Sequence, residues 1–452
     1  MAQFLKIKED HPSALLFYRM GDFYELFFDD AVAAAQALDI TLTKRGKHQG
    51  ADIPMCGVPV HAAEGYLLNL IRKGFRVAVC EQLENPQEAK KRGAKSVVKR
   101  GVVRLVTPGT LTEDTLLHPR ESNFLASFVQ VRNQSCLSWV DISTGDLRYS
   151  PCPPVRLGPE LARLAPAEVL VAERASNKIL EIIQECGAAA TELPKDIFDS
   201  TAGADKICKA YGVGDLGGLG KFGRADIAAI SGLIEYLSAT QKGQLPLLRQ
   251  PVCEAQDGFV AIDAATRKNL ELTQTLSGER SGSLLSVVDR SVTAAGARLL
   301  SRRITTPSQR LATIEERASA VAFFCGQSGL RGAVRSALKQ LPDVERALGR
   351  VALERSGPRD LLALGSGITQ AAQVRALLAQ HDLPPLLQNA ADDLKGFEDL
   401  FDELDRALVS EAPLLARDGG FVATGYSTEL DEITALRDEA RSVIARMQAD
   451  YA

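Results

Sequence analysis

The hydrophobic pattern changes character near residue 250, and this change restricts the folds that are open to the chain. Before it, short apolar runs such as residues 124–131 and 168–171 are typical of strands and alternate with helical segments. After it, strand signals nearly vanish and apolar residues recur at three-and-four spacing over long stretches. A chain of 452 residues is also too long for a single core. We therefore expect a multidomain protein, α/β first and all-α afterwards.

Turn residues and the change of hydrophobic pattern together predict three domains. Thr107-Pro108-Gly109-Thr110 carries turn residues, so residues 104–117 are predicted to be a linker after a small mixed α/β domain at residues 1–106. A second α/β domain is predicted at residues 107–250 and a helical domain at residues 251–452. The expected strands are residues 15–19, 75–81, 124–131, 137–142 and 168–171, and the expected helices are residues 30–37, 62–73, 160–164, 204–210, 264–276, 294–303, 313–324, 343–354, 359–379 and 428–451.

The most informative segment for function is FYRMGDFYELFF, at residues 17–28. If Gly21 supplies the permissive backbone angle of a tight turn, residues 15–19 and 23–27 form a hairpin. Phe23 and Glu25 then point to the same face, because side chains alternate along a strand. The neighbouring Phe17, Phe27 and Phe28 are expected in the core.

An exposed phenylalanine beside a carboxylate suits the inspection of base pairs in DNA. An apolar side chain pushed between base steps kinks the duplex, and this insertion has an unstacking cost. The cost is lowest where pairing is already poor, so a Phe23 wedge favours mismatched or unpaired bases. Glu25 would accept a hydrogen bond from a base N–H, or donate one if protonated. The pair therefore predicts recognition of pairing defects in duplex DNA.

The same segment resembles the Phe-x-Glu motif of the MutS family of DNA mismatch-recognition proteins. The resemblance implies that Phe23 is the stacking wedge and Glu25 its hydrogen-bonding companion. Arg45 and Met55 lie in two further matching segments and are additional candidates for DNA contact. The matches run along the whole chain, at residues 42–46 (LTKRG), 53–59 (IPMCGVP), 79–82 (VCEQ), 103–110 (VRLVTPGT), 262–272 (IDAATRKNLEL) and 417–420 (RDGG).

The resemblance also implies a domain organisation. Residues 1–106 would be the mismatch-binding domain, residues 107–250 a ribonuclease-H-like α/β connector, and residues 251–452 an incomplete helical core or lever domain. The helix at residues 428–451 has no C-cap or terminator after it. In the family such a helix leads to a DNA-gripping clamp and returns to an ATPase domain. We therefore expect an N-terminal portion that lacks the clamp and the ATPase.

No enzymatic chemistry is expected from this chain. The sequence contains no G-x-x-x-x-G-K-[ST] segment, so the phosphate-cradling loop of a P-loop ATPase is missing. ATP and magnesium are cofactors of the full-length family, and here we expect no cofactor, no metal and no catalytic residue. The eight cysteines form no C-x-x-C pair and the five histidines lie far apart, which argues against a zinc site. GVGDLG at residues 212–217 fits a dinucleotide fingerprint but follows a predicted helix rather than a strand.

Mismatched double-stranded DNA is the expected ligand, and the resemblance adds a second MutS subunit and downstream mismatch-repair proteins as partners. The net charge of -4 requires that any DNA contact be local. The absence of a leader and of a long apolar run favours a cytoplasmic protein without membrane contact, and the resemblance implies a bacterial, nucleoid-associated one. The basic candidates near the wedge are Lys44, Arg45, Lys47, Arg72, Lys73 and Arg76. A second basic run consists of Lys90, Lys91, Arg92, Lys95, Lys99, Arg100 and Arg104, and a solvated surface explains residues 90–95 at least as well as phosphate contact.

Two alternative functions use the middle domain. If its early strands form a ribonuclease-H-like sheet, Asp141 would help to hold the magnesium of a metal-dependent nuclease. This hairpin supplies only Asp141 and Asp146, and Asp146 is expected to cap its own turn. The other alternative is a protein-interaction scaffold, which would stand alone only if residues 1–106 did not bind DNA.

Overall fold

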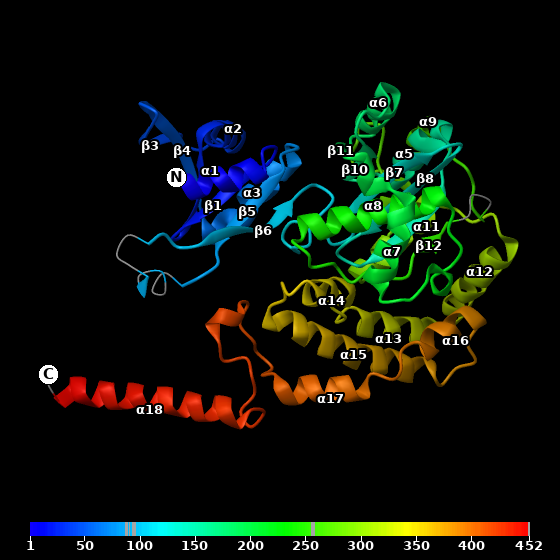
Figure 1. The fold of residues 1–452 in the computed structure, drawn as a ribbon. Coiled ribbons are helices and arrows are strands. Elements are labelled where there is room, and N and C mark those ends of the chain that lie inside the picture. The colour runs from blue at the N-terminus through cyan, green and yellow to red at the C-terminus, as the bar shows by residue number, and fades with distance from the viewer. Residues whose placement is uncertain (86–88, 90, 93–95, 255–257, 451–452) are drawn as a thin grey trace. The chain divides into compact units, whose positions relative to one another are not determined.

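The computed structural model describes residues 1–85, 89, 91–92, 96–254 and 258–450 of the chain (Figure 1). The chain forms two compact units, residues 1–311 and residues 312–452. The described part of the first unit contains two six-stranded sheets with their helices. The described part of the second unit is helical, with one isolated bridge between Leu408 and Val422. The predicted order, α/β followed by helices, is confirmed.

The first sheet has the strand order β3-β4-β2-β1-β5-β6. Strand β1 runs parallel to β5, and the other neighbouring strands pair antiparallel. The predicted hairpin is therefore present as β1 and β2. The elements are α1 (Ala2–Asp10), β1 (Leu15–Met20), β2 (Phe23–Phe27), α2 (Phe28–Leu38), β3 (Thr43–His48), β4 (Ala51–Pro59), η1 (Val60–Ala62), α3 (Ala63–Arg72), β5 (Val77–Gln82) and β6 (Arg100–Val106).

Helices cover both faces of this sheet. One face packs against α2 and α3, with Phe17 of β1 in the shared core as predicted. On the other face Phe4 of α1 packs edge-on against Tyr18 and Phe27, at ring-centroid distances of 5.5 and 5.1 Å. Phe28, also predicted as core, is partly buried and packs against the core under α1; it begins α2 in a left-handed backbone conformation with φ of 56°.

The second sheet has the strand order β11-β10-β7-β8-β9-β12. Helix α8 packs on one face of this sheet beside α7, while α5 and α6 contribute to the core on the other, which gives three layers. Trp139, the single tryptophan, is buried on β8. The elements are β7 (Phe124–Val131), β8 (Gln134–Asp141), β9 (Asp146–Pro151), η2 (Pro154–Arg156), α5 (Leu157–Leu164), β10 (Glu168–Ala172), α6 (Asn177–Glu185), β11 (Ala189–Leu193), η3 (Lys195–Phe198), α7 (Ser200–Tyr211), η4 (Leu216–Gly218), α8 (Arg224–Thr240) and β12 (Val252–Cys253).

The prediction of a linker at residues 104–117 is wrong. Residues 104–106 belong to β6, and Thr107 and Leu116 beyond it are buried. The turn at residues 107–110 is held by Glu168 of β10, whose carboxylate accepts hydrogen bonds from Thr107 Oγ1 (2.5 Å) and from the amide of Gly109 (3.0 Å). The turn residues of this segment indicated a linker. Their partner was not foreseen, because Glu168 lies far away from them in the sequence.

The helix predicted at residues 264–276 is correct only in its first part. Helix α9 covers Ala264–Asn269, and Glu271 has a left-handed φ of 46° that ends the helical path. Leu270 and Leu276 are exposed, so their helical spacing does not mark a buried face. The unit continues with α10 (Leu284–Val288) and α11 (Ala294–Thr305).

The second unit is arranged around α15, against which α13, α14 and α17 pack (Figure 1). Its core includes Val334 of α13, Val374 of α15 and Ala391 of α16. The predicted helix at residues 428–451 is present as α18 as far as Asp450, and Tyr451 lies outside the described residues. The helices are α12 (Leu311–Gly326), α13 (Ser328–Leu338), α14 (Val344–Ala352), α15 (Pro358–Leu378), α16 (Pro385–Asp392), α17 (Glu398–Ala407), η6 (Ala416–Asp418) and α18 (Thr428–Asp450).

Candidate nucleic-acid interface

A two-residue turn places the predicted wedge at the start of β2. Met20 pairs with Phe23, so the loop between β1 and β2 consists of Gly21 and Asp22. Gly21 has φ of 63°, a conformation that a residue without Cβ adopts at little cost. The backbone oxygen of Asp22 accepts a hydrogen bond from the amide of Val60 (2.9 Å), just after β4. The turn is therefore tied to two neighbouring strands.

Phe23 is exposed although it begins a strand of mostly buried residues. Its side chain is 47% exposed, whereas Tyr24 and Leu26 are buried on the face covered by α2 and α3. Phe27 lies on the same face as Phe23, but Phe4 of α1 covers it. Helix α1 thus leaves the turn end of β2 open. A large aromatic side chain beside a fixed turn is available for contact with a ligand.

Glu25 lies next to Phe23 on the same face, as predicted. Strand β4 pairs with β2 so that Gly57 lies opposite Glu25 and Pro59 opposite Phe23. A Cβ at Gly57 would lie 3.7 Å from Glu25 Cγ and 3.8 Å from Phe23 Cδ1, so both side chains lean over the glycine. Sequence reasoning missed this role of Gly57. A glycine inside a strand pattern is the signal for such a close approach.

Arg45 reaches Glu25 from the neighbouring hairpin. Its guanidinium forms an ion pair with the Glu25 carboxylate. The register of β3 against β4 shifts between Lys44 and Lys47, and Gly46 inside this shift has φ of 73°. A bulge of this kind re-aims a side chain. The Arg45 side chain remains 47% exposed and that of Glu25 is 14% exposed.

Met55 belongs to the floor of this region. On β4 it lies opposite Phe27 of β2 and Thr43 of β3, and it packs partly buried against the core under α1. Its position two residues from Gly57 places it on the face that carries the wedge. The structure therefore brings the four predicted site residues together on one face of the first sheet. We call this set the wedge face: Phe23, Glu25, Arg45 and Met55.

Much of the basic run after β5 is committed to protein partners. Lys91 and Lys99 are exposed, whereas Lys90 and Lys95 lie outside the described residues. Each of the three arginines in this run has a protein partner, and further exposed positive charge is supplied by Lys44, Arg45 and Lys47 of β3. The arginine partners are Glu84 for Arg92, the Tyr18 ring (5.1 Å from Arg100 Cζ) for Arg100, and Glu113 for Arg104.

Asp141, the candidate nuclease carboxylate, has a structural role. It is 2% exposed, and its side chain accepts hydrogen bonds from Ser143 N (3.0 Å), Ser143 Oγ (2.6 Å) and Asn123 N (3.2 Å). Asp141 therefore caps the turn after β8. The prediction had assigned this capping role to Asp146 and was wrong on that point.

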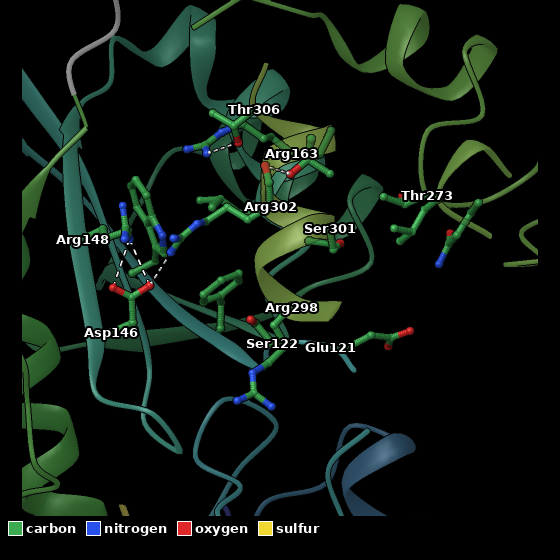
Figure 2. A pocket seen from close by; sticks show the side chains of 18 of the residues that line it. Glu121, Ser122, Asp146, Arg148, Arg163, Thr273, Arg298, Ser301, Arg302 and Thr306 are labelled. Carbon is green, nitrogen blue, oxygen red and sulfur yellow. Dashed lines mark hydrogen bonds and ion pairs between the residues drawn. The ribbon is translucent and has the colours of Figure 1, made fainter. Parts of the chain in front are cut away.

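Asp146 instead belongs to a chain of ion pairs beside a cavity of about 210 Å³ (Figure 2). Its carboxylate lies 3.0 Å from Arg148 Nε and 3.0 Å from Arg302 Nη1 of α11. Glu254 continues the chain, at 3.1 Å from both Arg148 Nη1 and Arg163 Nη1. Each carboxylate here is shared between arginines, which is unlike a set of converging metal ligands.

Two further observations concern metal binding and membrane-spanning helices. Within the described ranges, no group of three or more His, Cys, Asp or Glu side chains is placed to hold a metal ion. No helix in the described part of the chain is long and apolar enough to cross a membrane.

Comparison with known proteins finds three family models along the chain. Models of MutS domain I, MutS domain II and MutS domain III match residues 1–115, 123–249 and 265–450. The first covers the sheet with the wedge face, the second the three-layer domain and the third the helical part. The class defined by fold and site is thus a modular protein composed of successive MutS domains.

Curated relatives agree over the whole chain. DNA mismatch repair protein MutS of Paracoccus denitrificans is 62% identical over 451 residues, and that of Roseobacter denitrificans is 60% identical over 452 residues. The same protein of Dinoroseobacter shibae is 60% identical over 452 residues. Each match covers 100% of this chain and 51–52% of the relative, so the chain spans about half the length of these relatives. The chain belongs to the MutS family.

Proposed function

We propose that this chain recognises mismatched or unpaired bases in duplex DNA for DNA mismatch repair. The observation that carries the proposal is the exposed Phe23 ring on a fixed hairpin, with Glu25 beside it on the same open face. Phe23 inserts at a weakened base step and Glu25 forms a hydrogen bond with the displaced base. The exposed basic residues of β3 face the phosphates.

The energetics explain why such a site discriminates. Bending a duplex costs about 1–6 kcal/mol, and unstacking a base step adds a few kcal/mol. Stacking a base on an aromatic side chain returns about 1–3 kcal/mol. On a well-paired step the cost exceeds the return, so insertion is unfavourable. At a mismatch the unstacking cost falls, and the same contact becomes favourable.

Replacing Phe23 by alanine tests the proposal. The loss of about 1–3 kcal/mol of stacking corresponds to about a 5- to 150-fold loss of preference for a mismatched over a matched duplex. Affinities for both duplexes are measured by fluorescence anisotropy with the full-length protein. Phe397→Ala is the matched control, because Phe397 is 46% exposed but lies on the helical unit. A Phe23→Ala protein with unchanged discrimination and unchanged melting temperature would contradict the proposal.

We also propose that this chain hydrolyses neither ATP nor DNA and needs no cofactor of its own. The sequence lacks a P-loop, whose lysine and hydroxyl hold phosphates and magnesium in ATPases. The engagement of Asp141 in its turn and of Asp146 in ion pairs supports the same view. Incubation of this chain with labelled mismatched duplex, magnesium and ATP is expected to leave both substrates intact. Metal-dependent cleavage that disappears in Asp141→Asn would favour the nuclease instead.

A second MutS subunit and downstream repair proteins remain proposed partners. The support is membership of the family and the three-layer domain, which has no catalytic constellation among its described residues. Analytical ultracentrifugation of the full-length protein tests the self-association. A monomer at all concentrations would contradict it.

A further inference from the structure

We propose that Arg45 is a positioning residue that exchanges partners when DNA binds. In the DNA-free protein its guanidinium pairs with Glu25; on a duplex it moves to a backbone phosphate and releases Glu25 for the displaced base. This inference rests on the proposed function of the wedge face. It adds a step to that function: Arg45 stays paired with Glu25 until a DNA phosphate takes the place of the Glu25 carboxylate.

The local geometry singles out Arg45 among its neighbours. The bulge at Gly46 turns Arg45 toward Glu25, while the adjacent Lys44 pairs with Asp52 of β4 at 2.9 Å. Gly57 of β4 lies opposite Glu25 and carries no side chain, which leaves space beside the Glu25 side chain. The pair is thus built by a bulge on one strand and a glycine on the next.

The exposure of the two side chains makes the exchange possible. Arg45 is 47% exposed and can swing toward solvent, whereas Glu25 is 14% exposed and stays beside Phe23. A partly exposed ion pair typically strengthens an equilibrium by no more than about five-fold, so breaking it is inexpensive. A guanidinium forms the same forked contact with a phosphate as with a carboxylate.

The exchange has a consequence for selectivity. While Arg45 is paired, the negative charge of Glu25 is neutralised and does not repel the incoming phosphates. Once Arg45 has moved, Glu25 regains an unpaired carboxylate close to DNA. That charge is compensated only where a base N–H is free to bond with it, as at a mismatch. On a matched duplex it remains a penalty.

A double-mutant cycle distinguishes exchange from a static ion pair. The variants are Glu25→Ala, Arg45→Met and their combination, with binding to matched and mismatched duplexes measured over a range of salt concentrations. If Arg45 exchanges, Glu25→Ala strengthens matched-duplex binding about two- to five-fold more when Arg45 is present than when Met replaces it. If the pair stays intact on DNA, the order reverses, because Arg45 then shields Glu25.

The salt dependence provides a second readout. Loss of one phosphate contact lowers the slope of log affinity against log salt by about one unit, so Arg45→Met should show this change and Glu25→Ala should not. Arg45→Lys should retain the slope, because the positive charge is kept. Lys44→Met is the matched control: it removes a charge from the same strand, but its effect should simply add to that of Glu25→Ala.

The outcomes are decisive for this inference and separable from the proposed function. Additive effects of Glu25→Ala and Arg45→Met, a reversed order, or an unchanged salt slope in Arg45→Met would each overturn the exchange. The Phe23→Ala test reports on mismatch recognition independently, because it leaves both charges in place. Melting temperatures of all variants, which alter surface side chains, identify any loss of folding.

Discussion

Glu168→Ala is expected to destabilise the three-layer domain strongly. Glu168 is fully buried on β10, and its carboxylate accepts four hydrogen bonds. Burial, together with the nearby Glu168, raises the pKa of Tyr236 well above its ordinary value, so this phenol keeps its proton and donates. The donors are Thr107 Oγ1 (2.5 Å), the Gly109 amide (3.0 Å), Thr191 Oγ1 (2.7 Å) and the Tyr236 hydroxyl (2.6 Å).

The size of the effect follows from how many donors can find new acceptors. A buried donor without an acceptor costs about 1–3 kcal/mol. The three hydroxyls can rotate, and Thr107 Oγ1 already lies 2.9 Å from Thr110 Oγ1, whereas the Gly109 amide is fixed. We therefore expect a loss of about 3–5 kcal/mol for alanine rather than the full sum. Glu168→Gln keeps its shape and one acceptor oxygen, and about 1–2 kcal/mol is expected.

The single tryptophan makes this measurement local. Trp139 is buried on β8 in the same sheet as Glu168, so its fluorescence during a urea titration follows the unfolding of this domain. The helical unit contains no tryptophan and does not contribute. The reasoning would be refuted by a loss below about 1 kcal/mol for alanine, or by equal losses for alanine and glutamine.

Two further predictions use the same fluorescence assay. A Cβ at Gly145 (φ 73°) would lie 2.0 Å from the backbone oxygen of Leu247, so Gly145→Ala should lower the free energy of unfolding by about 2–4 kcal/mol. Gly187→Ala is the control, because Gly187 has φ of 75° but open space around it, and a loss of about 1 kcal/mol is expected. Similar losses for the two variants would contradict the clash. Burial alone would raise the pKa of Asp289, but hydrogen bonds from Arg120 and Ser291 and the charge of Arg120 together outweigh it and hold the pKa at about 2, below the ordinary 3.8. Because the folded-state pKa is the lower one, this stabilisation is complete above about pH 4 and is lost as the pH falls toward 2. Asp289→Asn should therefore lower stability at neutral pH and flatten its decline in acid, and an unchanged decline would count against the ion pair.

The hairpin and the shared face of Phe23 and Glu25 were predictable because they depend on local rules. A tight turn at Gly21 and the two-residue period of a strand involve only neighbours in sequence. The helices of the second unit were predictable for the same reason, since their apolar spacing is local. The resemblance to MutS then assigned roles that periodicity alone does not give.

The unpredicted features depend on contacts between distant residues. The pairing of Arg45 with Glu25 requires the register shift on β3, which one strand's sequence does not specify. Glu168 and the turn at residues 107–110 are separated in the chain by three strands (β7, β8 and β9) and helix α5, so neither sequence signalled the other. Asp146 was expected to serve its own turn, but its arginine partners include Arg302 on a distant helix.

The position of β3 at the edge of the first sheet has a consequence for handling the protein. Edge strands expose unpaired backbone groups and invite pairing with other chains, which charged side chains and bulges prevent. Lys44, Arg45 and Lys47, together with the bulge at Gly46, provide that protection here. A variant in which all three cations become apolar would therefore gain a tendency to aggregate, and the resulting loss of active protein would imitate a loss of affinity for DNA. Single substitutions keep the edge charged and avoid this confusion.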